Sequence, residues 1–140
     1  MSKSGPIILI DDDTDECELM HEAFKNLDVA NKLICFHDGQ EALDFLKSSD
    51  VQPFLILTDI NMPRLGGLEL RALIELDPVL KDKSIPFIFF TTSAASYAVR
   101  KAYEMSVQGF FEKSVGMQEL EHQLKAIVQY WLMCRHPRSD

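Results

Sequence analysis

Short apolar runs alternate along the chain with longer segments in which apolar residues recur every three or four positions. These continuous apolar runs predict five strands, over residues 6–10, 32–37, 53–58, 85–90 and 109–112. The helical spacing predicts five helices, over residues 14–27, 39–48, 67–76, 94–106 and 117–134. Pro78 is expected to end the third helix. This alternation predicts an α/β fold, in which right-handed crossovers place helices on both faces of a parallel sheet.

Polar residues that can carry chemistry follow several of the predicted strands. They are Asp11, Asp12 and Asp13 after the first strand, Asp59 after the third, Thr91 after the fourth, and Lys113 after the fifth. In open parallel sheets, ligands bind beyond the carboxyl ends of the strands, where the strand order reverses. If the order is 2-1-3-4-5, the first and third strands are neighbours, and their carboxylates converge on one crevice.

Several carboxylates in one crevice cannot all stay ionised without a cation. Oxygen ligands without histidine or cysteine suit Mg²⁺ best, and Mg²⁺ usually shares its site with a phosphoryl group. A lysine can neutralise one phosphoryl oxygen, and a threonine hydroxyl can donate to another. One aspartate can then act as a nucleophile and form an acyl phosphate.

The composition fits a single domain with one core over residues 1–140. The formal net charge of -8 disfavours binding to nucleic acid or to an anionic membrane surface. No apolar run approaches the roughly 20 residues of a membrane span, and the N-terminus lacks the apolar core of a signal peptide. We therefore expect a cytoplasmic protein.

The cysteines and histidines show no spacing typical of metal ligands. They are Cys17, Cys35, Cys134, His21, His37, His122 and His136. The cysteines are few, widely spaced and odd in number, so we expect reduced thiols and neither a disulfide framework nor a zinc site. The histidines are expected at the surface or at its boundary.

Four sequence blocks, in order, resemble the signature blocks of response-regulator receiver domains of the CheY-like type. They are "IILIDDD", "LILTDINMPRLGG", "PFIFFTTSA" and "GFFEKS", and the resemblance covers residues 6–133. It implies a flavodoxin-like, CheY-like sheet of order 2-1-3-4-5. It also implies a phosphoryl group carried on an aspartate and a protein-interaction face built from the fourth helix, fifth strand and fifth helix.

The resemblance assigns roles to seven residues of this chain. Asp59 resembles the phosphoacceptor, and Asp12 resembles the direct Mg²⁺ ligand. Asp11 resembles the partner that holds metal-bound water, and Asn61 matches the position whose backbone carbonyl completes the metal site. The remaining matches are Thr91 and Lys113, which meet the phosphoryl group in the family, and Phe110, which falls at the aromatic switch position.

Three positions depart from the family pattern. Ser114 stands where proline usually follows the lysine, so a cis peptide at that bond is disfavoured, and the reach of Lys113 stays open. The loop reads Leu65-Gly66-Gly67 where Asp-Gly or Asn-Gly is common. We expect little effect there, because Gly67 keeps the flexible position. Asp13 is an additional acid that can serve as a solvated neighbour or a helix cap.

These observations predict a switching module of a two-component system. A histidine kinase or a histidine phosphotransfer protein donates the phosphoryl group to Asp59, and the chain has no room for an output domain. The signal therefore passes to a downstream protein, or into a phosphorylation-dependent homodimer. The protein assists its own phosphoryl transfer and hydrolysis but is not expected to turn over a separate substrate.

Two alternatives remain open. A phosphatase of the haloacid-dehalogenase type also combines first-strand aspartates with Thr, Lys and Mg²⁺, and it would use Asp11 as nucleophile. That interpretation leaves "TDINMP" unexplained. A degenerate receiver would bind partners without phosphorylation, and the Ser114 departure keeps that interpretation open.

Overall fold

The computed structural model describes residues 2–62, 64–92 and 95–135. The chain alternates strands and helices in the order β1 (Ile7–Ile10), α1 (Thr14–Asn26), β2 (Leu33–Phe36), α2 (Gly39–Ser48), β3 (Leu55–Thr58), α3 (Gly67–Leu76), α4 (Pro78–Lys83), β4 (Phe87–Thr91), α5 (Ser96–Glu104), β5 (Gly109–Glu112) and α6 (Met117–Met133). The strands form one five-stranded sheet of order β2-β1-β3-β4-β5, and every neighbouring pair is parallel. The predicted fold class and strand order are confirmed.

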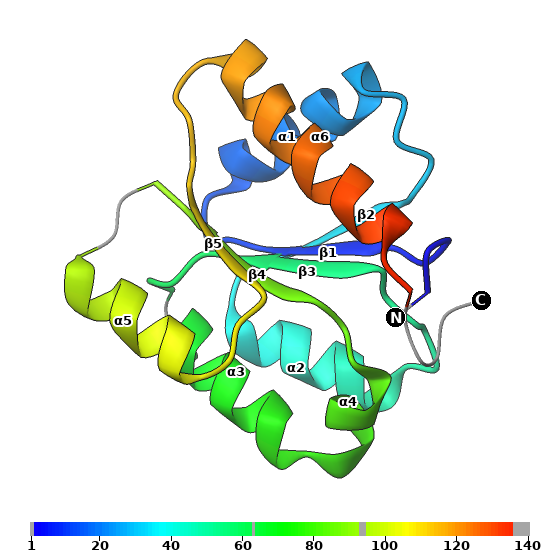
Figure 1. Cartoon of the computed structure of the whole chain (residues 1–140). Coiled ribbons are helices and arrows are strands. Elements are labelled where there is room, and N and C mark those ends of the chain that lie inside the picture. Colours follow the sequence, from blue (N-terminus) through cyan, green and yellow to red (C-terminus); the bar gives the residue numbers. More distant parts are fainter. Residues whose placement is uncertain (1, 63, 93–94, 136–140) are drawn as a thin grey trace.

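Helices cover both faces of the sheet (Figure 1). Helices α1 and α6 lie on one face, and α2, α3, α4 and α5 lie on the other. Successive side chains of β1 point to opposite faces. Ile7 and Leu9 belong to the core under α1 and α6, whereas Ile8 and Ile10 belong to the opposite core. Strands buried on both faces explain why the strand segments are almost continuously apolar.

Pro78 begins a helix as well as ending one, which the sequence interpretation missed. It occupies the first turn of α4, where a missing backbone N–H costs nothing. The Asp77 carboxylate caps this helix by accepting from the N–H groups of Val79 and Leu80, at 2.9 and 3.1 Å. The prediction of five helices therefore omitted α4. Ala94, the first residue of the predicted helix 94–106, lies outside the described residues.

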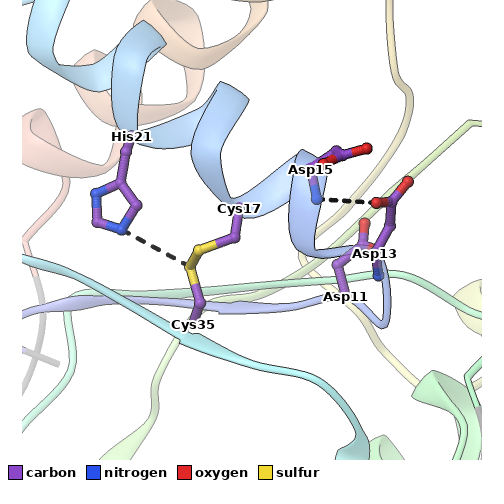
Figure 2. Close-up of a disulfide and its surroundings, with 6 residues drawn as sticks. All are labelled: Asp11, Asp13, Asp15, Cys17, His21 and Cys35. Carbon is purple, nitrogen blue, oxygen red and sulfur yellow. Dashed lines mark hydrogen bonds between the residues drawn. A yellow bond between two sulfur atoms is a disulfide. The ribbon is translucent and has the colours of Figure 1, made fainter.

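A disulfide joins α1 to β2, so the prediction that all the cysteines are reduced thiols is wrong. Cys17 and Cys35 are bonded, with their Cα atoms 6.3 Å apart and a sequence separation of 18. Figure 2 shows Cys17 on the helix above Cys35 on the strand. The two cysteines are far apart in sequence, and they meet because α1 folds back over the edge of the sheet. Their spacing alone therefore did not indicate the pair. Cys134 is free.

The carboxyl ends of the strands meet at one edge of the sheet, where backbone hydrogen bonds extend beyond the strands. The Asp11 N–H donates to Phe36 at 3.0 Å, and the Asp59 N–H donates to Ile10 at 2.9 Å. The Lys113 N–H donates to Thr91 at 2.7 Å. Each of these residues is thus anchored to the neighbouring strand. No helix within the described parts of the chain has the length and apolar character needed to cross a membrane.

Candidate functional site

Three carboxylates converge where β1 and β3 end. One oxygen each of Asp11, Asp12 and Asp59 lies within 4.8 Å of the others. Asp11 is buried, Asp59 is half-buried and Asp12 is exposed, so the group runs from the core to solvent. These donors are all hard carboxylate oxygens, and such a set fits Mg²⁺ better than a softer metal.

The position of Asp11 disfavours the charged form of its carboxyl. Burial raises the pKa of its carboxyl, and the nearby charge of Asp59 acts in the same direction. Two contacts act in the opposite direction. The Asp13 N–H donates to Asp11 Oδ1 at 3.0 Å, and the Lys113 ammonium lies 3.3 Å from Asp11 Oδ2, but together they offset only part of the rise in pKa. An ionised Asp11 therefore gains from additional positive charge in the crevice.

Asp59 is held in place by two hydrogen bonds to the same oxygen. Its Oδ1 accepts from the Ile60 N–H at 2.8 Å and from the Thr91 hydroxyl at 2.5 Å. Thr91 is buried at the end of β4, the strand next to β3. The structure thus brings Thr91 directly against the predicted phosphoacceptor.

Lys113 is a buried cation between two acids. Its ammonium lies 2.8 Å from Glu16 Oε2 and 3.3 Å from Asp11 Oδ2. Desolvation by burial acts to lower its pKa, but the hydrogen bond to Glu16 and the charge of Asp11 outweigh it and raise the pKa above its usual range. Glu16 is a site residue that sequence reasoning missed. No short-range spacing could reveal it, because Glu16 and Lys113 are 97 positions apart.

Ser114 gives the loop after β5 a contact that proline cannot make. The Ser114 N–H donates to Gln123 Oε1 at 3.0 Å, and Gln123 Nε2 donates to the Glu112 carbonyl at 2.9 Å. The Gln123 side chain therefore bridges the residues on either side of Lys113. The Lys113–Ser114 peptide is not cis, the conformation that the missing proline disfavours.

Gly67 is required for space, which corrects the expectation that it supplies flexibility. Its φ is not positive. A Cβ at this position would lie 2.4 Å from the Asp59 carbonyl oxygen and 2.7 Å from a ring carbon of Phe89. The start of α3 thus packs directly against the backbone of the predicted phosphoacceptor.

The other predicted residues lie as follows. Asp13 is the N-cap of α1 and accepts from the Asp15 N–H at 2.9 Å, so its predicted capping role is confirmed. Asn61 is exposed in the loop after Asp59. Phe110 is half-buried, and its ring centroid lies 5.6 Å from that of Phe89. The metal role of Asn61 and the switch role of Phe110 stay predictions.

The histidines require one correction. His21, His37 and His122 are exposed, as predicted, and His136 lies outside the described residues. His21, however, does lie close to another potential metal ligand, because its Nε2 is 3.9 Å from Cys35 Sγ. Cys17, His21 and Cys35 form a second cluster of potential metal ligands, away from the carboxylates.

Known proteins share this fold and sequence pattern. A profile described as the response regulator receiver domain matches residues 7–125. Response regulator Rcp1 of Synechocystis sp. is 32% identical over 131 residues, covering 90% of this chain and 88% of Rcp1. The phosphorylated cyanobacterial phytochrome response regulator RcpA has a TM-score of 0.83 at 30% identity, covering 94% of this chain and 96% of RcpA. The Mn²⁺-bound form of Rcp1 has a TM-score of 0.79 at 31% identity, covering 94% of this chain and 97% of that one.

The fold and the sequence therefore define a CheY-like signalling module. The chain belongs to the response regulator receiver domain family of two-component systems. This membership does not favour the phosphatase interpretation.

Proposed function

We propose that Asp59 accepts a phosphoryl group from a phosphohistidine donor in a Mg²⁺-dependent reaction. The observation that carries the proposal is the convergence of the carboxylate cluster with Thr91 and Lys113 at one edge of the sheet. Residues 1–140 are proposed to act as one receiver domain, with a core over about 6–133. A signalling role without turnover of a separate substrate follows from this proposal.

The metal site is proposed to consist of Asp12, Asp11, Asp59 and the backbone carbonyl of Asn61. When bound, Mg²⁺ supplies positive charge to the phosphoryl oxygens and to the crowded carboxylates. Rcp1, a relative of this chain, has been solved in a Mn²⁺-bound form. In this chain the raised pKa of Asp11 indicates that the crevice favours additional positive charge.

The transfer step exchanges one phosphorus bond for another. An Asp59 carboxylate oxygen attacks phosphorus, and Oδ2 is the oxygen that the bonds to Ile60 and Thr91 do not use. The phosphorus–nitrogen bond to the donor histidine breaks, and its electron pair stays on the imidazole nitrogen. The product is an aspartyl phosphate.

Thr91 and Lys113 are proposed to hold the transferred group. The Thr91 hydroxyl is already directed at Asp59, so a small movement would let it donate to a phosphoryl oxygen. The Lys113 ammonium would neutralise another phosphoryl oxygen once it gives up its contact with Asp11 or Glu16. The movement of Thr91 would leave space that Phe110 fills, which is the switch role proposed for that ring.

The partners are proposed from chemistry and from the relatives. The donor is a histidine kinase or a histidine phosphotransfer protein in the cytoplasm. RcpA is described as a cyanobacterial phytochrome response regulator, so a phytochrome-linked histidine kinase is the first donor to test. The output face is proposed to comprise α5, β5 and α6, where Tyr97, Tyr103 and Tyr130 are 67%, 56% and 54% exposed. A downstream protein or a second phosphorylated copy would bind there.

Intact-mass measurement after incubation with Mg²⁺ and acetyl phosphate tests the proposal. We expect one phosphoryl adduct that hydroxylamine removes, that EDTA prevents and that Asp59→Asn abolishes. Asp50→Asn, at an exposed acid in the segment that precedes β3, at the opposite end of the strand from Asp59, is the matched control and should retain the adduct. An adduct that survives Asp59→Asn but requires Asp11 would instead support the phosphatase interpretation. No adduct from acetyl phosphate or from a phosphorylated histidine donor would support a degenerate receiver.

A further inference from the structure

A second group of potential ligands lies between α1 and β2, chemically unlike the carboxylate cluster. It consists of two sulfur atoms and one imidazole nitrogen, from Cys17, Cys35 and His21, all within 4.8 Å of one another. Figure 2 shows the His21 ring turned toward the sulfur atoms from the same helix that carries Cys17. The two cysteines are half-buried, and His21 is exposed.

We propose that Cys17, His21 and Cys35 form a binding site for a thiophilic divalent cation such as Zn²⁺ when the disulfide is reduced. Two thiolates and an imidazole match the ligand preferences of Zn²⁺, and a water molecule would take the fourth position. This site does not depend on phosphoryl transfer at Asp59.

The backbone already places the three donors for this geometry. Cys17 and His21 are four residues apart on α1, so both side chains lie on one side of the helix. Cys35 faces them from β2, with its Cα 6.3 Å from that of Cys17. The Nε2–Sγ distance of 3.9 Å between His21 and Cys35 is close to the roughly 3.5 Å edge of a tetrahedral Zn²⁺ site. Once the disulfide is reduced, the two sulfur atoms must separate to about 3.8 Å, the edge of a tetrahedral site for two thiolates, which side-chain rotation can provide.

The disulfide determines whether the site exists. Two molecules of a low-molecular-weight thiol reduce it in two exchange steps, through a mixed disulfide, so that the protein gains two thiols and the two reductant molecules leave joined as one disulfide. Zn²⁺ binding then releases the two thiol protons to solvent. A reducing compartment such as the cytoplasm, where we propose that this protein acts, favours the thiol form. The disulfide and the metal-bound form are therefore alternative states of the same residues.

The two clusters are expected to select different cations. The carboxylates of Asp11, Asp12 and Asp59 offer only oxygen and suit Mg²⁺, whereas sulfur and nitrogen suit Zn²⁺ or Co²⁺. Excess Mg²⁺ can therefore occupy the carboxylate cluster while a thiophilic metal is titrated. This difference makes the second site measurable by itself.

Cobalt absorption spectroscopy tests the proposal. A Cys134→Ser background leaves only the two relevant thiols. The full-length protein is reduced, desalted without oxygen, checked for two free thiols per chain, and titrated with Co²⁺ in excess Mg²⁺. We expect thiolate-to-cobalt charge-transfer bands that saturate at one equivalent and disappear when Zn²⁺ is added. The oxidised protein should show none.

Variants separate the proposed site from adventitious thiol binding. His21→Gln should weaken Co²⁺ binding at least about tenfold, the lower bound for loss of an outer-shell partner. His122→Gln, at an exposed histidine on α6, should not change it. Because His21 is exposed, its substitution tests the proposal even if Cys35→Ser folds poorly.

Three results would overturn the proposal. The first is two free thiols per chain without charge-transfer absorption. The second is absorption that His21→Gln leaves unchanged, which would reduce the site to a pair of thiols. The third is a disulfide that thiol reductants do not open in the folded protein.

Discussion

The Lys113 ammonium lies 2.8 Å from a carboxylate oxygen of Glu16, which joins the end of β5 to the first turn of α1. Lys113 also lies 3.3 Å from Asp11, so two acids share one buried cation in the resting protein. A phosphoryl group on Asp59 would compete with both acids for that cation. Glu16 is thus proposed to restrain Lys113 until phosphorylation.

Glu16→Gln is expected to raise the fraction of phosphorylated protein at subsaturating acetyl phosphate. The neutral amide keeps the shape of Glu16 but removes its charge, so Lys113 is released more easily to the phosphoryl group. We expect an increase of about three- to tenfold in the ratio of phosphorylated to free protein, since hydrogen bonds to charged groups contribute about 1.5–3 kcal/mol and partial exposure reduces this. Intact-mass measurement gives the ratio.

Glu18→Gln is the matched control for this prediction, because Glu18 is an exposed acid on the same helix. It should leave the ratio unchanged. A lower ratio in Glu16→Gln would show that Glu16 orients Lys113 productively and does not compete with the phosphoryl group.

Without metal, the stability of the protein is expected to fall as the pH rises through the titration of Asp11. Burial raises the pKa of Asp11 above its ordinary value of 3.8. Between the ordinary pKa, which Asp11 has in the unfolded chain, and the raised pKa that it has in the folded protein, the folded protein retains a proton that the unfolded chain has lost. The free energy of unfolding therefore decreases with rising pH in this range. Lys113 remains protonated throughout this window because its own pKa is raised.

Asp11→Asn should remove this part of the pH dependence and raise the melting temperature at neutral pH in EDTA. Thermal unfolding of both proteins across the acidic and neutral range measures the effect. Mg²⁺ should then stabilise the unmodified protein more than the variant. Parallel stability curves for the two proteins would contradict the electrostatic role given to Asp11.

Gly67→Ala is expected to destabilise the protein by about 1–3 kcal/mol, the usual cost of overpacking. The new Cβ would meet the Asp59 carbonyl oxygen at 2.4 Å and Phe89 at 2.7 Å. Denaturant unfolding measures the loss. Gly109→Ala is the control, because a Cβ there would meet side-chain atoms only at ordinary contact distances of 3.4 Å or more and its φ is not positive. Equal unfolding free energies for the two variants would rule out the close contact at Gly67.

Reduction of the disulfide is expected to lower the free energy of unfolding by about 3 kcal/mol, the loss of loop-closure constraint for a loop of this size. The bond closes a loop with a sequence separation of 18 residues. Urea unfolding with and without reductant measures the difference in metal-free buffer. Cys134→Ser should respond as the unmodified protein does, whereas Cys35→Ser should not respond to reductant. An unchanged midpoint after confirmed reduction would contradict the prediction.

The sequence predicted the main features of the site because the rule that locates them is topological. Residues that follow strands of a parallel sheet must share one edge, and Asp11, Asp59, Thr91 and Lys113 do so. The strand order, implied by the resemblance to receiver domains, is confirmed. The chemical roles of these residues stay predictions until phosphorylation is measured.

The features that the sequence could not predict depend on long-range packing of side chains. Glu16 reaches Lys113, and Cys17 reaches Cys35, only because α1 packs over the edge of the sheet. Gln123, on α6, meets Ser114 in the loop before that helix, a contact that no motif in the sequence indicated. Helix α4 was missed for a local reason, since Pro78 was taken only as a stop although proline favours the first turn of a helix.

Mapping the phosphorylated residue tests the central claim most directly. The protein is phosphorylated in Mg²⁺, reduced with borohydride, which converts an aspartyl phosphate to homoserine, and digested for peptide mass spectrometry. We predict homoserine at Asp59 and at no other aspartate. Homoserine at Asp11 with Asp59 unchanged would contradict the account and would place the nucleophile on β1 in place of β3.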